Sequence, residues 1–198
     1  MSYTRLSINF QPKTAQCTRR WVLLSGFAIW ANCQSLEVVS ALADSDLPEN
    51  SAAPPMSHAI SDENGRPFTI ASLRGRPVLI NFWASWCAPC IVEMPSLQTA
   101  AKLLQPEGID VLLISVDRGG PRKALPVLQS KGVTLPRFGF DPNAALSREM
   151  GVSGLPTSFL LSADQKKCFV YVGPREWHEE AMLDEIRHFV DQLGGVGK

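Results

Sequence analysis

Short apolar runs alternate with amphipathic segments over most of this chain. The runs at 78–82 and 109–116 are largely apolar, which is typical of central strands covered on both faces. Apolar residues at spacings of three and four predict helices over 88–104 and 178–193. Weaker signals predict strands at 138–140, 158–162 and 167–172, and helices at 144–150 and from Gly119-Gly120-Pro121 to Lys131. Strands that alternate with helices in this way predict an α/β fold around a mixed sheet.

The segment before the first long strand predicts an additional β-hairpin. The dipeptide Asn64-Gly65 favours a hairpin turn, and the short segments 58–60 and 68–70 flank it. Residues 71–75 then predict a short turn of helix that leads into the strand.

The first 43 residues have the order of an export leader, in which basic residues precede an apolar run. The basic side chains are Arg5, Lys13, Arg19 and Arg20. The apolar run is 21–31, and Ala41-Leu42-Ala43 offers a cleavage site with small residues. This run falls short of the roughly 20 residues that span a membrane, so we expect an exported, periplasmic protein. An uncleaved leader that anchors the protein in the membrane is the alternative.

The amino-acid composition predicts a linker that is followed by one globular domain. Residues 44–55 are rich in Ser, Ala, Pro, Asp and Glu, and they predict a flexible linker. The remainder, 56–198, is long enough for one globular domain, since 45% of the 198 residues of the chain are hydrophobic. The formal net charge is zero at pH 7, which argues against a nucleic-acid partner.

The motif Trp86-Cys87-Ala88-Pro89-Cys90 lies where a predicted strand ends and a predicted helix begins. Free amides and the helix dipole at that place favour the thiolate of the first cysteine. The second cysteine lies one turn further along, close enough to form a disulfide or to resolve a mixed one. This spacing predicts a redox-active pair, with Cys87 as the nucleophile and Cys90 as the resolving cysteine.

Two other interpretations of the pair are a structural disulfide and half of a zinc site. A structural zinc site takes four ligands, usually from a second cysteine pair or a histidine pair. This sequence has no second pair of that spacing, because Cys17 and Cys33 fall in the predicted leader and Cys168 stands alone. We therefore expect no metal and no cofactor, and we expect Cys168 to be a small buried side chain.

Two motifs resemble those of a known family. They are Asn81-Phe82-Trp83-Ala84-Ser85-Trp86-Cys87-Ala88-Pro89-Cys90, followed by Glu93-Met94-Pro95, and Gly154-Leu155-Pro156-Thr157-Ser158-Phe159. Together they are similar to the exported, thioredoxin-like thiol–disulfide oxidoreductases of the TlpA and ResA type, over roughly residues 56–193. The resemblance implies a thioredoxin fold with an added N-terminal β-hairpin, and disulfide exchange as the activity.

The resemblance also implies roles for residues near the dithiol. Pro156 matches the cis-proline of the family, which faces the two sulfurs, and Leu155 before it faces the substrate. Trp86 shields the nucleophile and offers an apolar contact surface. Glu93 matches an acidic residue that accepts or relays the proton of Cys90. The alternative for Glu93 is a solvated surface residue that the helix dipole favours.

Members of this family include proteins that keep the cysteines of apocytochrome c or of copper sites reduced. The resemblance therefore implies a reductase, whose partners are disulfide-containing exported clients and a membrane thiol electron donor. A disulfide-inserting oxidase or isomerase is the alternative enzyme, and a copper-binding or chaperone-like module is the alternative of another class. Asn81 stands where cytosolic thioredoxins have a buried Asp, so their proton route does not carry over directly.

Overall fold

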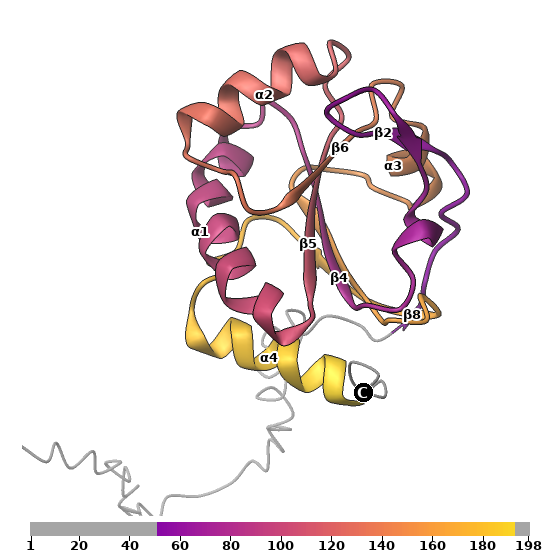
Figure 1. Cartoon of the computed structure of the whole chain (residues 1–198), viewed down its shortest axis with the longest axis vertical. Helices are drawn as coiled ribbons and strands as arrows, with labels where there is room; N and C mark the ends of the chain where they lie inside the picture. Colours follow the sequence, from indigo (N-terminus) through magenta and orange to yellow (C-terminus); the bar gives the residue numbers. More distant parts are fainter. Residues whose placement is uncertain (1–50, 193–198) are drawn as a thin grey trace, which may run out of the picture. The chain divides into compact units, whose positions relative to one another are not determined.

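The computed structural model describes residues 51–192. The predicted leader, residues 44–50 of the predicted linker, and Cys17 and Cys33 lie outside the described residues. The elements, shown in Figure 1, are β1 (Ser51–Ala52), β2 (Ile60–Ser61), β3 (Pro67–Phe68), η1 (Ile70–Leu73), β4 (Val78–Trp83), α1 (Ala88–Leu104), η2 (Gln105–Glu107), β5 (Asp110–Ser115), α2 (Pro121–Ser130), β6 (Arg137–Phe140), α3 (Ala145–Glu149), β7 (Thr157–Leu161), β8 (Lys167–Val172) and α4 (Glu180–Gln192).

The strands of the described residues form one mixed sheet in the order β1-β8-β7-β4-β5-β6-β2-β3. β4 pairs in parallel with β5 and antiparallel with β7. β6 extends the parallel part next to β5, and β8 extends the antiparallel part next to β7. β4 and β5 are therefore central strands, as their apolar runs predicted, and the prediction of an α/β fold around a mixed sheet is confirmed.

Each face of the sheet has its own hydrophobic core, because side chains alternate along the strands. Leu79 of β4 belongs to the core on the face that α1, α2 and α4 cover. Ile80 belongs to the core on the other face, which η1, β2 and α3 cover. Figure 1 shows α1 and α4 on the side of the sheet opposite to α3. The alternation directs Asn81 towards α1.

The predicted N-terminal hairpin is confirmed next to β6. β2 pairs antiparallel with β3, and Ser61 of β2 pairs with Phe140 of β6. Gly65 in the turn has a φ of 78°, which glycine adopts without the strain of a Cβ. The Asp62 carboxylate accepts a hydrogen bond from the backbone N–H of Asn64 at 2.8 Å, and this bond helps to fix the turn.

The end of the predicted linker is part of the sheet. Ser51 and Ala52 form β1, which pairs antiparallel with the first residues of β8. The N–H of Ala53 adds a hydrogen bond to the carbonyl of Lys166 at 2.9 Å. Composition did not indicate this pairing, because an edge strand offers backbone partners whatever the side chains are. Residues 51–53 are thus held by the sheet, and the flexible linker predicted over 44–55 needs correction there.

The helix predicted over 88–104 is confirmed with the same bounds. The last helix begins at Glu180 instead of residue 178, because the chain makes a turn there in which the N–H of Glu179 donates to the carbonyl of Glu176. Cys168 is buried, as expected. None of the helices within residues 51–192 is long and apolar enough to cross a membrane.

Candidate active site

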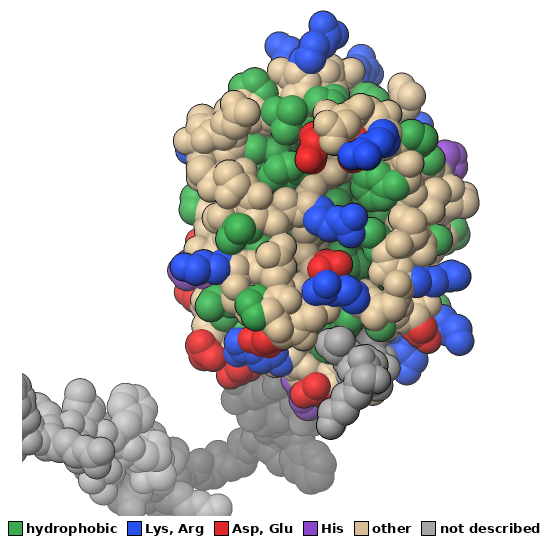
Figure 2. Space-filling model, viewed as in Figure 1, with side chains coloured by type: hydrophobic (Ala, Val, Ile, Leu, Met, Phe, Trp, Pro, Cys, Tyr) green, Lys and Arg blue, Asp and Glu red, His purple; other side chains and the backbone are tan. Residues whose placement is uncertain are grey.

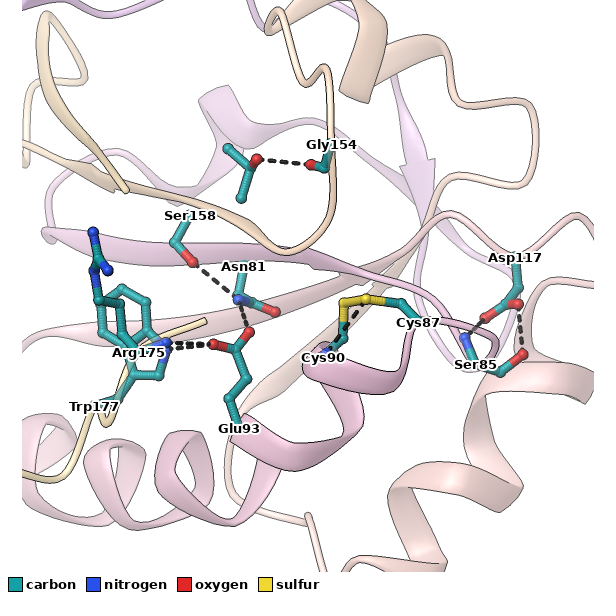
Figure 3. The surroundings of a disulfide bond; sticks show 11 residues. Asn81, Ser85, Cys87, Cys90, Glu93, Asp117, Gly154, Ser158, Arg175 and Trp177 are labelled. Carbon is teal, nitrogen blue, oxygen red and sulfur yellow. Dashed lines mark hydrogen bonds between the residues drawn. A yellow bond between two sulfur atoms is a disulfide. The ribbon is translucent and has the colours of Figure 1, made fainter. Parts of the chain in front are cut away.

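Cys87 and Cys90 form a disulfide where the chain passes from β4 into α1, as Figure 3 shows. Cys87 is the N-cap of α1, and its Sγ accepts a hydrogen bond from the backbone N–H of Cys90 at 3.3 Å. Pro89 fits the first turn, where its missing N–H removes no bond of the helix. Cys87 is 5% exposed and Cys90 is 1% exposed. Cys87 is therefore the more accessible of the two residues, and an N–H of the first helical turn faces its sulfur.

The loop before the dithiol is held by Asp117, which follows β5. Ser85 donates to the Asp117 carboxylate through its backbone N–H at 2.8 Å and through its hydroxyl at 2.7 Å. The hydroxyl of Ser115 donates to the same carboxylate at 2.9 Å. Because β4 and β5 are parallel neighbours, their carboxyl ends bring these groups together. Asp117 is thus a positioning residue for the dithiol loop.

The loop before β7 lies at the same end of the sheet, because β7 runs antiparallel to β4. The peptide bond between Leu155 and Pro156 is cis, as the resemblance implied. The carbonyl of Pro156 accepts a hydrogen bond from the N–H of Gly173 at 2.9 Å. The hydroxyl of Thr157 donates to the carbonyl of Gly154 at 2.8 Å. These two bonds fix the loop on either side of the cis bond.

A cleft of about 520 Å³ opens beside Cys87. Trp86 and Leu155 both line it, whereas Pro156 is buried and does not belong to its walls. Trp86 is 71% exposed, an unusual state for a large aromatic side chain. The structure thus brings Trp86, Cys87 and Leu155 to one surface, which has the apolar character of a contact surface.

Glu93 is buried, with 1% of its surface exposed, so the alternative of a solvated surface residue is wrong. It lies one turn after Cys90 on α1 and points towards Asn81 in Figure 3. Its Oε1 accepts a hydrogen bond from Asn81 Nδ2 at 2.8 Å. Its Oε2 accepts from the backbone N–H of Arg175 at 3.1 Å and from Trp177 Nε1 at 3.2 Å.

Burial raises the pKa of Glu93 above its ordinary value. Its three hydrogen bonds act in the opposite direction but do not cancel this effect, since none of the donors is charged. The carboxyl group therefore holds a proton at a higher pH than an exposed glutamate does. A carboxyl group in this state is suited to exchange a proton with a neighbouring thiol.

Asn81 connects this carboxylate to β7, because its Nδ2 also donates to Ser158 Oγ at 2.9 Å. The buried carboxylate of the site therefore comes from α1, and the strand supplies an amide. Sequence reasoning did not assign a role to Ser158, Asp117 or Trp177. Asp117 carried a usable signal, as a polar residue directly after a buried strand. Trp177 carried none, because it lies in the loop between β8 and α4.

The site thus consists of a dithiol at a helix N-terminus and a cis-proline loop beside it, both at one end of a mixed sheet. The family model described as Redoxin matches residues 48–186. The chain belongs to the redoxin family.

Similar proteins indicate to which type of redoxin this chain belongs. Thiol-disulfide oxidoreductase ResA of Geobacillus thermodenitrificans is 30% identical over 142 residues, which cover 71% of this chain and 75% of that protein. Thiol:disulfide interchange protein HelX of Rhodobacter capsulatus is 37% identical over 109 residues, which cover 54% of this chain and 59% of HelX. This redoxin is therefore a thiol–disulfide oxidoreductase of the ResA type, and the family resemblance is confirmed.

A solved structure gives the same answer for the fold. The crystal structure of a thiol:disulfide interchange protein DsbE from Chlorobium tepidum superimposes with a TM-score of 0.62 at 27% identity. It covers 75% of this chain and 100% of its own. The thioredoxin fold implied by the two motifs is thereby confirmed for this redoxin.

Proposed function

We propose that this redoxin reduces disulfides of exported client proteins through Cys87 and Cys90. The observation that carries the proposal is the position of Cys87, which caps α1 beside an open cleft while Cys90 is buried one turn further in. A client disulfide reaches the first sulfur and not the second. This asymmetry is what exchange through a mixed disulfide requires.

Each step of the exchange conserves electrons and protons. The Cys87 thiolate attacks one sulfur of the client disulfide, and the other client sulfur leaves as a thiolate that takes up a proton. Cys90 then loses its proton to Glu93 and attacks Sγ of Cys87, and the second client sulfur leaves as a thiolate that takes up a proton from water. The client gains two electrons, and the Cys87–Cys90 pair loses two and becomes the disulfide. A thiol donor returns the pair to the dithiol by the same chemistry.

Three residues form or shape the client-binding site in this proposal. Trp86 and Leu155 provide the apolar walls of the cleft next to Cys87. Pro156 does not line the cleft, but its cis bond turns the Gly154–Leu155 backbone towards it. Glu93 accepts the proton that Cys90 loses, since it is the buried carboxylate one turn away.

Glu93→Gln is expected to slow client reduction about a hundredfold near neutral pH and to remove the part of the pH dependence that Glu93 causes. The fold persists, because the oxygen of the new amide can accept from Arg175 and Trp177 while a turned Asn81 amide accepts from its nitrogen. Single-turnover rates against pH measure the effect. Glu63→Gln, which removes an exposed carboxylate, is the matched control. Identical pH profiles for Glu93→Gln and the parent would assign the proton of Cys90 to another acceptor.

The direction of electron flow is tested by the reduction potential of the Cys87–Cys90 pair. For a reductase we expect a value more negative than about −180 mV, on the side of thioredoxin. Equilibration with glutathione or dithiothreitol buffers, followed by alkylation and mass spectrometry, gives the potential. A value near −120 mV, as in strongly oxidising enzymes, would favour the disulfide-inserting alternative.

The compartment and the partners belong to the same proposal. The basic and apolar order of residues 1–43 supports export to the periplasm, with an uncleaved membrane anchor as the alternative. Outside the cytosol a dithiol needs a dedicated source of electrons, which we place in a membrane thiol donor. Clients of the apocytochrome c or copper-site class follow from the resemblance to the TlpA and ResA type.

A further inference from the structure

Two further hollows adjoin the cleft beside the dithiol. Val116 lines all three, Trp86 lines the cleft and the first hollow, and Arg148 lines the cleft and the second. Their shared walls make one continuous surface around Cys87, which we call the client face. The client face is defined by Trp86, Val116, Arg118, Lys123, Arg148 and Leu155.

The client face carries three exposed cations: Arg118, Lys123 and Arg148. None of them takes part in an ion pair within residues 51–192. Within the same residues Arg66, Arg76, Lys166 and Arg187 form ion pairs with carboxylates. The positive charge of the client face is therefore not used within this part of the fold.

The carboxylates closest in sequence to these cations are engaged elsewhere. Asp117 is the one acidic residue among those described that line the three hollows, and it is buried and accepts hydrogen bonds from Ser85. Glu149, next to Arg148, accepts from the hydroxyl of Ser57 and from the N–H of His58, which lower the pKa of Glu149 to about 2. Neither carboxylate forms an ion pair with a cation of the client face.

The position of Lys123 is one at which a positive charge does not stabilise the fold. It is in the first turn of α2, a turn without acidic residues, and the helix dipole there disfavours positive charge. Its side chain lies against Gly119, where a Cβ would be only 2.5 Å from Lys123 Cγ. Figure 2 shows basic side chains over one end of α2, at the upper edge of the visible surface. This placement indicates a binding role for the charge.

We propose that the client face binds an extended client segment in which acidic side chains flank the reactive cysteine. The inference rests on the proposed function, because the segment is held while its disulfide reacts with Cys87. The apolar walls contact residues next to the client cysteine, and the three cations attract carboxylates on either side of it. Since the chain as a whole has no net charge, the selectivity comes from this local arrangement.

The test uses the reduced full chain and three peptides that share one sequence and one internal disulfide but carry Glu, Ser or Lys beside the cysteines. Stopped-flow tryptophan fluorescence gives the rate constant for each. At low ionic strength we expect the Glu peptide to react about tenfold faster than the Ser peptide, and the Lys peptide to react more slowly. The difference should vanish between about 0.01 M and about 1 M salt, where the Debye length falls from about 30 Å to about 3 Å.

The triple variant Arg118→Gln, Lys123→Gln, Arg148→Gln is expected to bring the ratio of Glu to Ser rates close to one. The ratio is the readout, because any change in the thiolate of Cys87 affects both peptides alike. The matched control removes three exposed cations that line none of the hollows, namely Arg74, Lys102 and Lys131, and should keep the ratio. Arg148→Gln alone, with an expected threefold loss (roughly one surface charge pair), repeats the test if the triple variant does not fold.

Equal rates for the three peptides, or an equal loss of selectivity in the two triple variants, would overturn this inference and leave the proposed function standing. Reduction of none of the peptides would overturn the proposed function and the inference with it.

Discussion

Cys90→Ser is expected to stop turnover and to accumulate mixed disulfides between Cys87 and client proteins. The intramolecular attack by Cys90 has an effective concentration far above that of any external thiol, so we expect client release to slow about a thousandfold or more. Purification under non-reducing conditions, followed by diagonal gels and mass spectrometry, measures the adducts and names the clients. A cytochrome c precursor or a copper-site protein among the main adducts would define the pathway.

The matched control is Cys87→Ser, which removes the nucleophile and should trap almost nothing. The cysteine that remains at the active site, Cys90, is 1% exposed and does not meet clients directly. Trapping of the same proteins by both variants would contradict the assignment of nucleophile and resolving cysteine. Adducts with many unrelated secreted proteins would favour the oxidase or isomerase alternative.

Asn81→Asp is expected to destabilise the folded protein by about 3 kcal/mol at pH 8. The new carboxylate replaces a donor that lies 2.8 Å from Glu93 Oε1, and two buried carboxylates at this distance cannot both ionise. One of them takes a proton, and each unit by which its pKa rises costs about 1.4 kcal/mol. Urea unfolding at a series of pH values measures the loss.

The pH dependence has a defined sign. An acid whose pKa is higher in the folded state than in the unfolded state binds its proton more tightly when folded, so stability falls as pH rises. The loss begins near the unfolded pKa of about 4 and continues up to the raised folded value. Below about pH 4 both states are protonated, and Asn81→Asp should be close to the parent in stability.

The double variant Asn81→Asp, Glu93→Gln is the control for this prediction. The amide introduced on α1 can donate its Nε2 to the carboxylate introduced on β4, while its oxygen still accepts from Arg175 and Trp177, so most of the lost stability should return. A single variant as stable as the parent at pH 8 would mean that the pair separates or that water enters between the two carboxylates.

The dithiol and the architecture could be predicted from the sequence, because the signals that specify them are local. The Cys-x-x-Cys spacing and the apolar run before it place two sulfurs at a strand-to-helix junction, and α1 has the predicted bounds. The cis bond before Pro156 needed the family resemblance, since an X-Pro bond is trans in most cases. The local sequence signals thus identified the nucleophile, and the resemblance to the family identified the cis-proline loop beside it.

The environment of Glu93 could not be predicted, because its partners are distant in sequence. The spacing from Cys90 placed Glu93 on the helix face of the dithiol, and whether that face is covered depends on the loop that carries Trp177 and Arg175. Those two residues lie 84 and 82 positions away. The pairing of β1 was hidden for a related reason, since backbone hydrogen bonds leave little trace in composition.

β1 lies at the end of the sheet opposite to the dithiol. Ser51 pairs with Cys168, which pairs with Leu161, which in turn pairs with Val78 at the beginning of β4, whereas Cys87 follows the end of that strand. The six residues of β4 separate these two poles by about 20 Å. A label or linker attached directly at residue 51 would therefore lie at the pole of the sheet opposite to the dithiol and would leave the surface around Cys87 uncovered.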